Sequence, residues 1–153
     1  MEGAEVMLDP ALTGLEQLHS LFGAAGSGVG ITRLLGITTD AIDDGHVAFG
    51  LDTRPEMCNP AGVVHGGIAA TLLDSAMSCA VHSTLRVGER YTTVDLHIHY
   101  TRPIAPDQGH IVASGDVVHR GGRIATAEGR LVDRDGKLLA HGTTTCLVMP
   151  VIS

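Results

Sequence analysis

The distribution of apolar and polar residues divides the chain into one long apolar run and several shorter alternating segments. The run comprises residues 59–85, NPAGVVHGGIAATLLDSAMSCAVHSTL, and contains one formal charge, Asp74. Its Ala, Leu and Met content favours helix, and the run is too long for a strand. A helix that is apolar on every face is normally buried on every face. We therefore predict a central helix that the rest of the chain covers.

The segment before this run is predicted to contain one short amphipathic helix. Apolar residues recur at helical spacing between residues 12 and 22, and Thr13 is a candidate N-cap. Residues 23–30, GAAGSGVG, form a turn-rich break. We therefore separate an N-terminal segment, residues 1–30, from a single domain that comprises residues 31–153.

Six segments have the alternation of strands. Their predicted bounds are 31–41, 46–51, 92–100, 110–119, 123–133 and 137–149. The sequences DDG at 43–45 and RGG at 120–122 are typical of tight turns between antiparallel neighbours. One face of strand 92–100 is predicted to carry Val94, Leu96, Ile98 and Tyr100. The order of one helix, two strands, a long helix and four strands predicts an α+β fold, in which an antiparallel sheet packs one face on the helix.

Composition narrows the possible classes of protein. The chain has 153 residues, enough for one domain, and is 44% hydrophobic but only 3% aromatic, so its core is aliphatic. Such an apolar chain can hide surface in an oligomer. A net charge of −7 argues against a nucleic-acid partner, which requires a basic face. The central helix approaches the length of a membrane span, but Asp74, His82 and two glycines favour a buried helix over a membrane helix.

Three cysteines without a CxxC motif indicate a reducing compartment. The N-terminal sequence MEGAEVMLDP is acidic and has no apolar run, so no signal peptide is visible. We therefore expect a cytoplasmic protein.

Two glycines at the start of the central helix are candidates for binding a ligand through the backbone. Gly66 and Gly67 lie in the predicted first turn, where glycine costs about 0.5–1 kcal/mol relative to alanine. In return, glycine lets another group approach the backbone closely. The first N–H groups of a helix lack internal partners and carry the positive end of its dipole. Such N–H groups suit a carbonyl oxygen that gains negative charge during a reaction.

Asp74 is the candidate acid or base. A carboxylate in apolar surroundings is costly to ionise, so its pKa should rise, and such groups often do acid–base work. Asp74 follows Gly67 by seven residues, which puts both on nearly the same helix face about 10.5 Å apart. An antiparallel copy of the helix across a two-fold axis would bring the partner's Asp74 toward Gly67. Taken singly, a Gly-Gly pair or one helical Asp is more often structural, and the combination motivates a functional hypothesis.

These residues carry a resemblance to a known family. The pattern N-P-x-G-x-x-H-G-G-x-x-x-x-x-x-D, which runs from Asn59 to Asp74, resembles the motif of hotdog-fold acyl-CoA thioesterases of the phenylacetic-acid-degradation (PaaI-like) type. The resemblance continues through 92–96, 100–103 and the turn 120–123, and spans about residues 45–149. It implies a hotdog fold, a curled antiparallel sheet wrapped around one long helix. It also implies hydrolysis of an acyl- or aryl-CoA to the free acid and CoA.

The resemblance further implies a homodimer or a dimer of dimers with shared active sites. Coenzyme A would enter as part of the substrate, and neither a cofactor nor a metal is expected. The acyl-CoA would be the small-molecule partner. Acyl length, aryl preference and the choice between dimer and tetramer stay open.

The resemblance also implies roles for individual residues at the reacting centre. The Gly67 N–H, with Gly66 helping, is the oxyanion donor. Asp74 of the opposing subunit is general base or nucleophile, and both routes stay open. Asn59 helps to hold the thioester carbonyl or the water, and His65 supports the reaction or orients the loop. Thr93 positions water beside the acid, with Thr92 as the alternative.

The carrier portion of the substrate has its own candidate residues. The turn Arg120-Gly121-Gly122-Arg123 offers N–H groups and guanidinium groups to phosphates. Tyr100 is expected to line the path of the pantetheine arm. The alternative for the turn is a plain hairpin with two solvated arginines.

Three rival interpretations remain at this stage. Asp95, His97 and His99 form D-x-H-x-H on one strand face, a set of metal-ligand types that no nearby Cys or Glu cluster completes. The same groove could bind acyl-CoA or lipid without turnover. A related hotdog dehydratase would act on hydroxyacyl thioesters, which the Asn-HGG-Asp pattern fits less well.

Overall fold

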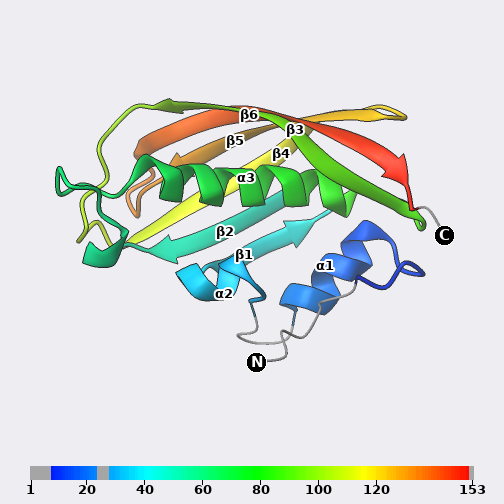
Figure 1. The fold of residues 1–153 in the computed structure, drawn as a ribbon, viewed down its shortest axis with the longest axis horizontal. Helices are drawn as coiled ribbons and strands as arrows, with labels where there is room; N and C mark the ends of the chain where they lie inside the picture. Colours follow the sequence, from blue (N-terminus) through cyan, green and yellow to red (C-terminus); the bar gives the residue numbers. More distant parts are fainter. Residues whose placement is uncertain (1–7, 24–27, 152–153) are drawn as a thin grey trace.

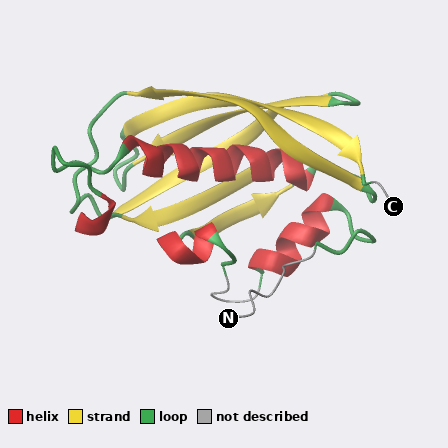
Figure 2. Ribbon diagram, viewed as in Figure 1, coloured by secondary structure: helices red, strands yellow, loops and turns green. Residues whose placement is uncertain are grey.

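The structure, a computed structural model, describes residues 8–23 and 28–151. The elements are α1 (Gly14–Phe22), α2 (Ile31–Leu35), β1 (Thr38–Asp43), β2 (His46–Asp52), a 3₁₀ turn (Pro55–Met57), α3 (Gly66–Ser83), β3 (Glu89–Tyr100), β4 (His110–Arg120), β5 (Ile124–Val132) and β6 (Leu138–Pro150). The six strands form one antiparallel sheet in the order β1-β2-β4-β5-β6-β3. This sheet curls around α3 (Figures 1 and 2). The predicted α+β hotdog fold is confirmed.

Helix α3 lies very close to the middle of the sheet. A Cβ added to Gly115 would lie 2.5 Å from backbone atoms of Ala76, and one added to Gly129 would lie 2.8 Å from the Met77 side chain. Glycine at these two strand positions therefore allows the contact. Leu72, Leu73, Ala76, Met77 and Ala80 are fully buried on the sheet side of the helix.

The opposite side of α3 departs from the prediction of burial on every face. Gly67 is exposed, and Ala70, Thr71, Asp74 and Ser75 are only half-buried. We call these five residues the open stripe. A single sheet layer covers one side of a helix, and the small and polar residues of the open stripe lie outside that contact.

The N-terminal helix α1 packs against α3, as Figure 1 shows. Thr13 and Glu16 form a capping box at its start, which supports the predicted N-cap. Leu18 is 1% exposed, and the Gly14 N–H donates to the Leu85 carbonyl oxygen at 2.9 Å. Half of the predicted break at 23–30, residues 24–27, lies outside the described residues.

The strand predicted at 31–41 is wrong in its first half. Ile31–Leu35 forms the short helix α2, and β1 begins only at Thr38. Gly36 ends the helix in the left-handed region at φ 73°, and its N–H bonds the carbonyls of the preceding turn. The alternation that predicted a strand from residue 31 therefore applies only after Gly36, where the helix has ended. The predicted turn at 43–45 does join β1 to β2, with Gly45 at φ 78°.

Strand β3 contains a β-bulge that changes the predicted alternation. The pairing of β3 with β6 shifts register between Thr93 and Asp95, so Val94 is the extra residue. Val94 is 60% exposed, and its predicted place on the same face as Leu96 is wrong. Because of the bulge, Thr93 lies on the same face of β3 as Leu96 and Ile98.

Candidate active site

The start of α3 brings together His65 and the two glycines. His65 is the N-cap, and its Nδ1 accepts a hydrogen bond from the Gly67 N–H at 2.8 Å. The predicted oxyanion donor therefore already has an acceptor, the side chain two residues before it. No acceptor contacts the Gly66 N–H within the described part of the chain. Tyr100 Oη donates to the Gly66 carbonyl at 2.8 Å, and a Cβ on Gly66 would lie 3.2 Å from the Tyr100 ring.

Asn59 lies beside this helix start in a loop that its own side chain shapes. Asn59 Oδ1 accepts from the Ala61 N–H at 2.9 Å and from the Val63 N–H at 3.4 Å. No hydrogen bond uses Asn59 Nδ2 among the described residues. A cavity of about 280 Å³ is lined by Asn59, Gly66 and Tyr100, among others. Three of the predicted site residues therefore share one small cavity.

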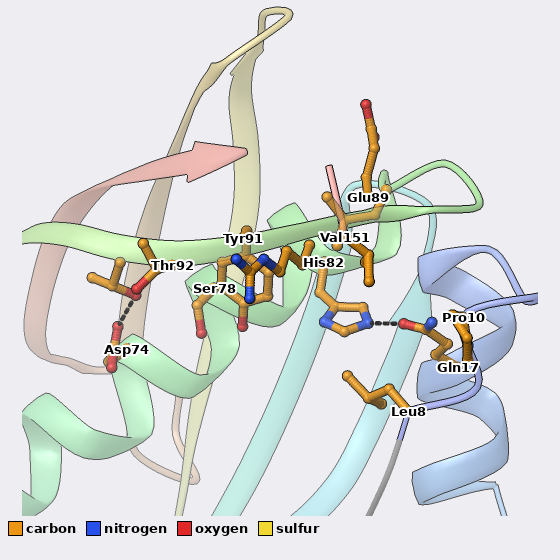
Figure 3. Close-up of a pocket in the computed structure, with 13 residues that line it drawn as sticks. Leu8, Pro10, Gln17, Asp74, Ser78, His82, Glu89, Tyr91, Thr92 and Val151 are labelled. Carbon is orange, nitrogen blue, oxygen red and sulfur yellow. Dashed lines mark hydrogen bonds between the residues drawn. The ribbon is translucent and has the colours of Figure 1, made fainter. Parts of the chain in front are cut away.

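Asp74 and Thr93 meet in a second, larger cavity of about 640 Å³. Thr93 Oγ1 donates to Asp74 Oδ1 at 3.4 Å, and Asp74 is half-buried. Figure 3 shows Asp74 on α3 in this cavity. Burial raises the pKa of Asp74 above its ordinary value, and the Thr93 hydrogen bond opposes this only in part. The structure places Thr93, rather than Thr92, in contact with the acid.

The two cavities lie at different positions along helix α3. Gly67 and Asp74 both belong to the open stripe, but seven helical residues separate them by about 10.5 Å. The carboxylate of one chain therefore does not reach the N–H groups of its own helix start.

The turn at the end of β4 holds its first arginine internally. Arg120 Nη2 pairs with Glu89 Oε2 at 2.5 Å, Nε donates to Thr84 Oγ1 at 3.2 Å, and Nη1 bonds the Gly121 carbonyl. This guanidinium ties β4 to the start of β3. Arg123 and Gly122 are exposed. Figure 1 places this turn at the opposite end of the molecule from the start of α3.

Four further groups in the large cavity were missed in the sequence. Ser78, His82 and Tyr91 line it together with Gln17 of α1. His82 Nε2 lies 2.8 Å from Gln17 Oε1, and burial lowers the pKa of His82 to about 4. Burial also raises the pKa of Tyr91. The one available signal was the spacing of four residues from Asp74 to Ser78 and again to His82, which repeats on one helix face.

The D-x-H-x-H residues are dispersed among ordinary sheet contacts. Asp95 Oδ1 accepts from the Thr145 N–H at 3.1 Å, and the His99 ring stacks on His141 with centroids 5.1 Å apart. No group of three metal-ligand side chains gathers within residues 8–23 and 28–151. In the same ranges, no helix is long and apolar enough to cross a membrane.

Comparison of the sequence with known proteins identifies its family. The sequence profile of the thioesterase superfamily matches residues 61–140. The chain belongs to the thioesterase superfamily. Human acyl-coenzyme A thioesterase 13 is 33% identical over 115 residues, which cover 74% of this chain and 81% of that protein. The predicted thioester hydrolase class is thereby confirmed.

Two solved structures extend the similarity to the fold. The BH2602 protein from Bacillus halodurans, crystallised with CoA, is 33% identical with a TM-score of 0.70, covering 78% of this chain and 75% of that one. A phenylacetic acid degradation-related protein from Ralstonia eutropha is 28% identical with a TM-score of 0.73, covering 84% and 96%. The resemblance to PaaI-like thioesterases is confirmed.

Proposed function

We propose that this superfamily member hydrolyses an acyl-CoA to the free acid and CoA in a site shared by two subunits of a homodimer. The observation that carries the proposal is the separation of Asp74 from Gly67 along the open stripe. An antiparallel second copy of α3 across a two-fold axis brings the partner's Gly67 to Asp74 and covers both stripes. Two such sites form in each dimer, whether it stands alone or within a tetramer. The human relative and the CoA-containing neighbour support the choice of substrate.

In this site the thioester carbonyl lies at the start of α3. Its oxygen displaces the His65 ring from the Gly67 N–H, and the neighbouring Gly66 N–H helps to hold the developing negative charge. His65 thus holds the helix start in the free enzyme. Asn59, whose Oδ1 is used within its loop, presents Nδ2 to the carbonyl or to water.

Asp74 of the other subunit supplies the basic or nucleophilic group. As a base it takes a proton from water, and the hydroxide adds to the carbonyl carbon. The tetrahedral intermediate then expels the CoA thiolate, which takes up a proton. As a nucleophile it attacks the carbonyl carbon and expels the CoA thiolate, which takes up a proton, and water then hydrolyses the resulting anhydride. Thr93 orients the carboxylate in either route, and the raised pKa makes Asp74 a stronger base than an exposed carboxylate.

For the CoA portion, we assign different roles to the residues of the turn 120–123. Arg120 fixes the turn, and the Gly121 N–H donates to the Ile124 carbonyl at 2.8 Å. Exposed Arg123 and the Gly122 N–H are therefore the groups that face the phosphates. Tyr100 lines the pantetheine path beside the helix start.

Arg123→Ala is expected to raise KM for acyl-CoA about tenfold, equivalent to about 1.4 kcal/mol, with kcat nearly unchanged. The same variant should leave KM unchanged for an acyl-pantetheine, which lacks the nucleotide phosphates. Arg130→Ala, which removes another exposed arginine from β5, is the matched control. Equal effects of Arg123→Ala on both substrates would contradict a phosphate contact.

The reaction itself is tested by measuring thiol release from short, medium, long and aryl acyl-CoAs. Turnover with equal amounts of free acid and CoA is expected. Tight binding without turnover would instead indicate a binding module, and an unsaturated thioester product would indicate a dehydratase.

A further inference from the structure

The large cavity continues beyond Asp74 along α3 to a polar end. Asp74, Ser78 and His82 line it at successive four-residue steps, and Tyr91 of β3 faces the same space (Figure 3). Gln17 of α1 lies behind His82 and closes this end. The reacting thioester needs only the first part of a cavity of about 640 Å³, so the polar end is available to the acyl group.

Gln17 fixes which nitrogen of His82 carries the proton. Gln17 Nε2 donates to the carbonyl oxygens of Asp9 at 2.7 Å and Leu12 at 3.4 Å. The Gln17 amide oxygen is therefore the atom that lies 2.8 Å from His82 Nε2, and an oxygen acceptor requires N–H at that nitrogen. His82 Nδ1 is then an acceptor. Because His82 is 6% exposed and its pKa falls to about 4, the ring stays neutral near pH 7.

The acceptor nitrogen of His82 faces the cavity. Figure 3 shows the ring nitrogen that does not bond Gln17 directed into the space beside Ser78 and Tyr91. No protein donor contacts His82 Nδ1 among the described residues, and none of their fully buried side-chain N or O atoms lacks a partner. His82 Nδ1 is therefore accessible from the cavity and needs a donor from whatever fills it.

We propose that His82, held by Gln17, selects acyl groups that carry a hydroxyl or other hydrogen-bond donor at the end remote from the thioester. The inference rests on the proposed function, which places the thioester at Asp74. His82 follows Asp74 by eight residues, or about 12 Å along the helix. With contacts of about 3 Å at each end, about 6 Å remains for the acyl group. A para-substituted ring or a chain of about six atoms has this length.

The test compares acyl-CoAs that differ only at the remote end. Hexanoyl-, 6-hydroxyhexanoyl- and 6-methoxyhexanoyl-CoA form one series, and benzoyl-, 4-hydroxybenzoyl- and 4-methoxybenzoyl-CoA form another. The hydroxyl compound of at least one series should exceed its parent in kcat/KM by about 10- to 100-fold, because it satisfies an otherwise unpaired acceptor. The methoxy compounds accept but do not donate, so they should show no gain.

Two variants connect this preference to the residues. His82→Phe keeps a ring but removes the acceptor, and it should bring the hydroxyl-to-parent ratio to about one. Gln17→Leu removes the oxygen that fixes the N–H at His82 Nε2, so the proton can move to Nδ1 and the hydroxyl-to-parent ratio should also fall toward one. Thermal unfolding is recorded for both variants as a check on folding. Equal kcat/KM for hydroxyl and parent compounds in both series, or a preference that survives His82→Phe, would overturn the proposal.

Failure of the proposed function gives a different result. In that case none of the six acyl-CoAs is hydrolysed. Calorimetric titration with the matching thioether analogues, which cannot be hydrolysed, then measures the hydroxyl preference independently of turnover. Tighter binding of the hydroxyl analogue that is lost in His82→Phe supports the pocket proposal, and equal binding overturns it.

Discussion

Asp74→Asn is expected to lower kcat by about 10²–10⁴-fold while the Kd for acyl-CoA changes little. The amide has nearly the same shape as the carboxylate and can keep its contact with Thr93, but it neither accepts a proton from water nor attacks a carbonyl. Thiol release gives kcat, and calorimetry on the variant gives Kd. Unchanged turnover would show that Asp74 is not the reacting carboxylate.

The stability of the same variant serves as its internal control. The pKa of Asp74 is raised in the folded protein, so between the unfolded value near 3.8 and the raised value the folded state binds more protons. The free energy of unfolding therefore falls as pH rises through this window. Asp74→Asn removes this loss of stability because the amide does not ionise. The variant should unfold at a higher temperature than wild type at pH 7, with the difference shrinking as pH approaches 3.8. An inactive variant with raised thermal stability has lost chemistry, not structure.

Mixing two inactive variants is expected to restore activity. Gly67→Pro deletes the N–H at the second helical position, where proline is tolerated, and should cost about 10²–10³-fold in kcat. In a mixed dimer with Asp74→Asn, one site combines both defects and the other has neither. Random pairing of equal amounts should recover about a quarter of wild-type activity, and each variant alone should recover none.

Gly67→Ala is the matched control for the proline variant. It adds a Cβ at the same position, 2.9 Å from His65 Nδ1, but keeps the backbone N–H. The alanine variant should retain much more activity than Gly67→Pro. If mixing restores nothing although the subunits exchange, each site lies within one chain and the shared-site proposal is wrong.

The parts of the fold that follow from local patterns could be predicted. The length and apolar content of residues 59–85 indicated the central helix, and the glycines at 66 and 67 do begin it. The seven-residue spacing from Gly67 to Asp74 correctly predicted that one chain holds these two residues apart. What covers the helix depends on how far one sheet extends around it, so the open stripe could not be predicted from the apolar run.

Other features arise from contacts between distant segments. Gln17 and His82 are 65 residues apart, and no local pattern links a helical glutamine to a helical histidine. The bulge at Val94 leaves the alternation of β3 intact on either side, so only the pairing with β6 reveals the shift. Arg120 and its partner Glu89 are 31 residues apart, so the turn motif at 120–123 does not indicate that this guanidinium ties β4 to β3.

Gln17 and Asp74 lie in parts of the sequence that can change independently. Asp74 lies within the residues that match the superfamily profile, whereas Gln17 lies well before them. Under the proposal for His82, replacement of the segment that carries Gln17 is expected to alter which acids are released and to leave Asp74 and Gly67 in place. If His82 selects the acyl group as proposed, substrate preference can change through a segment that carries none of the residues assigned to bond cleavage.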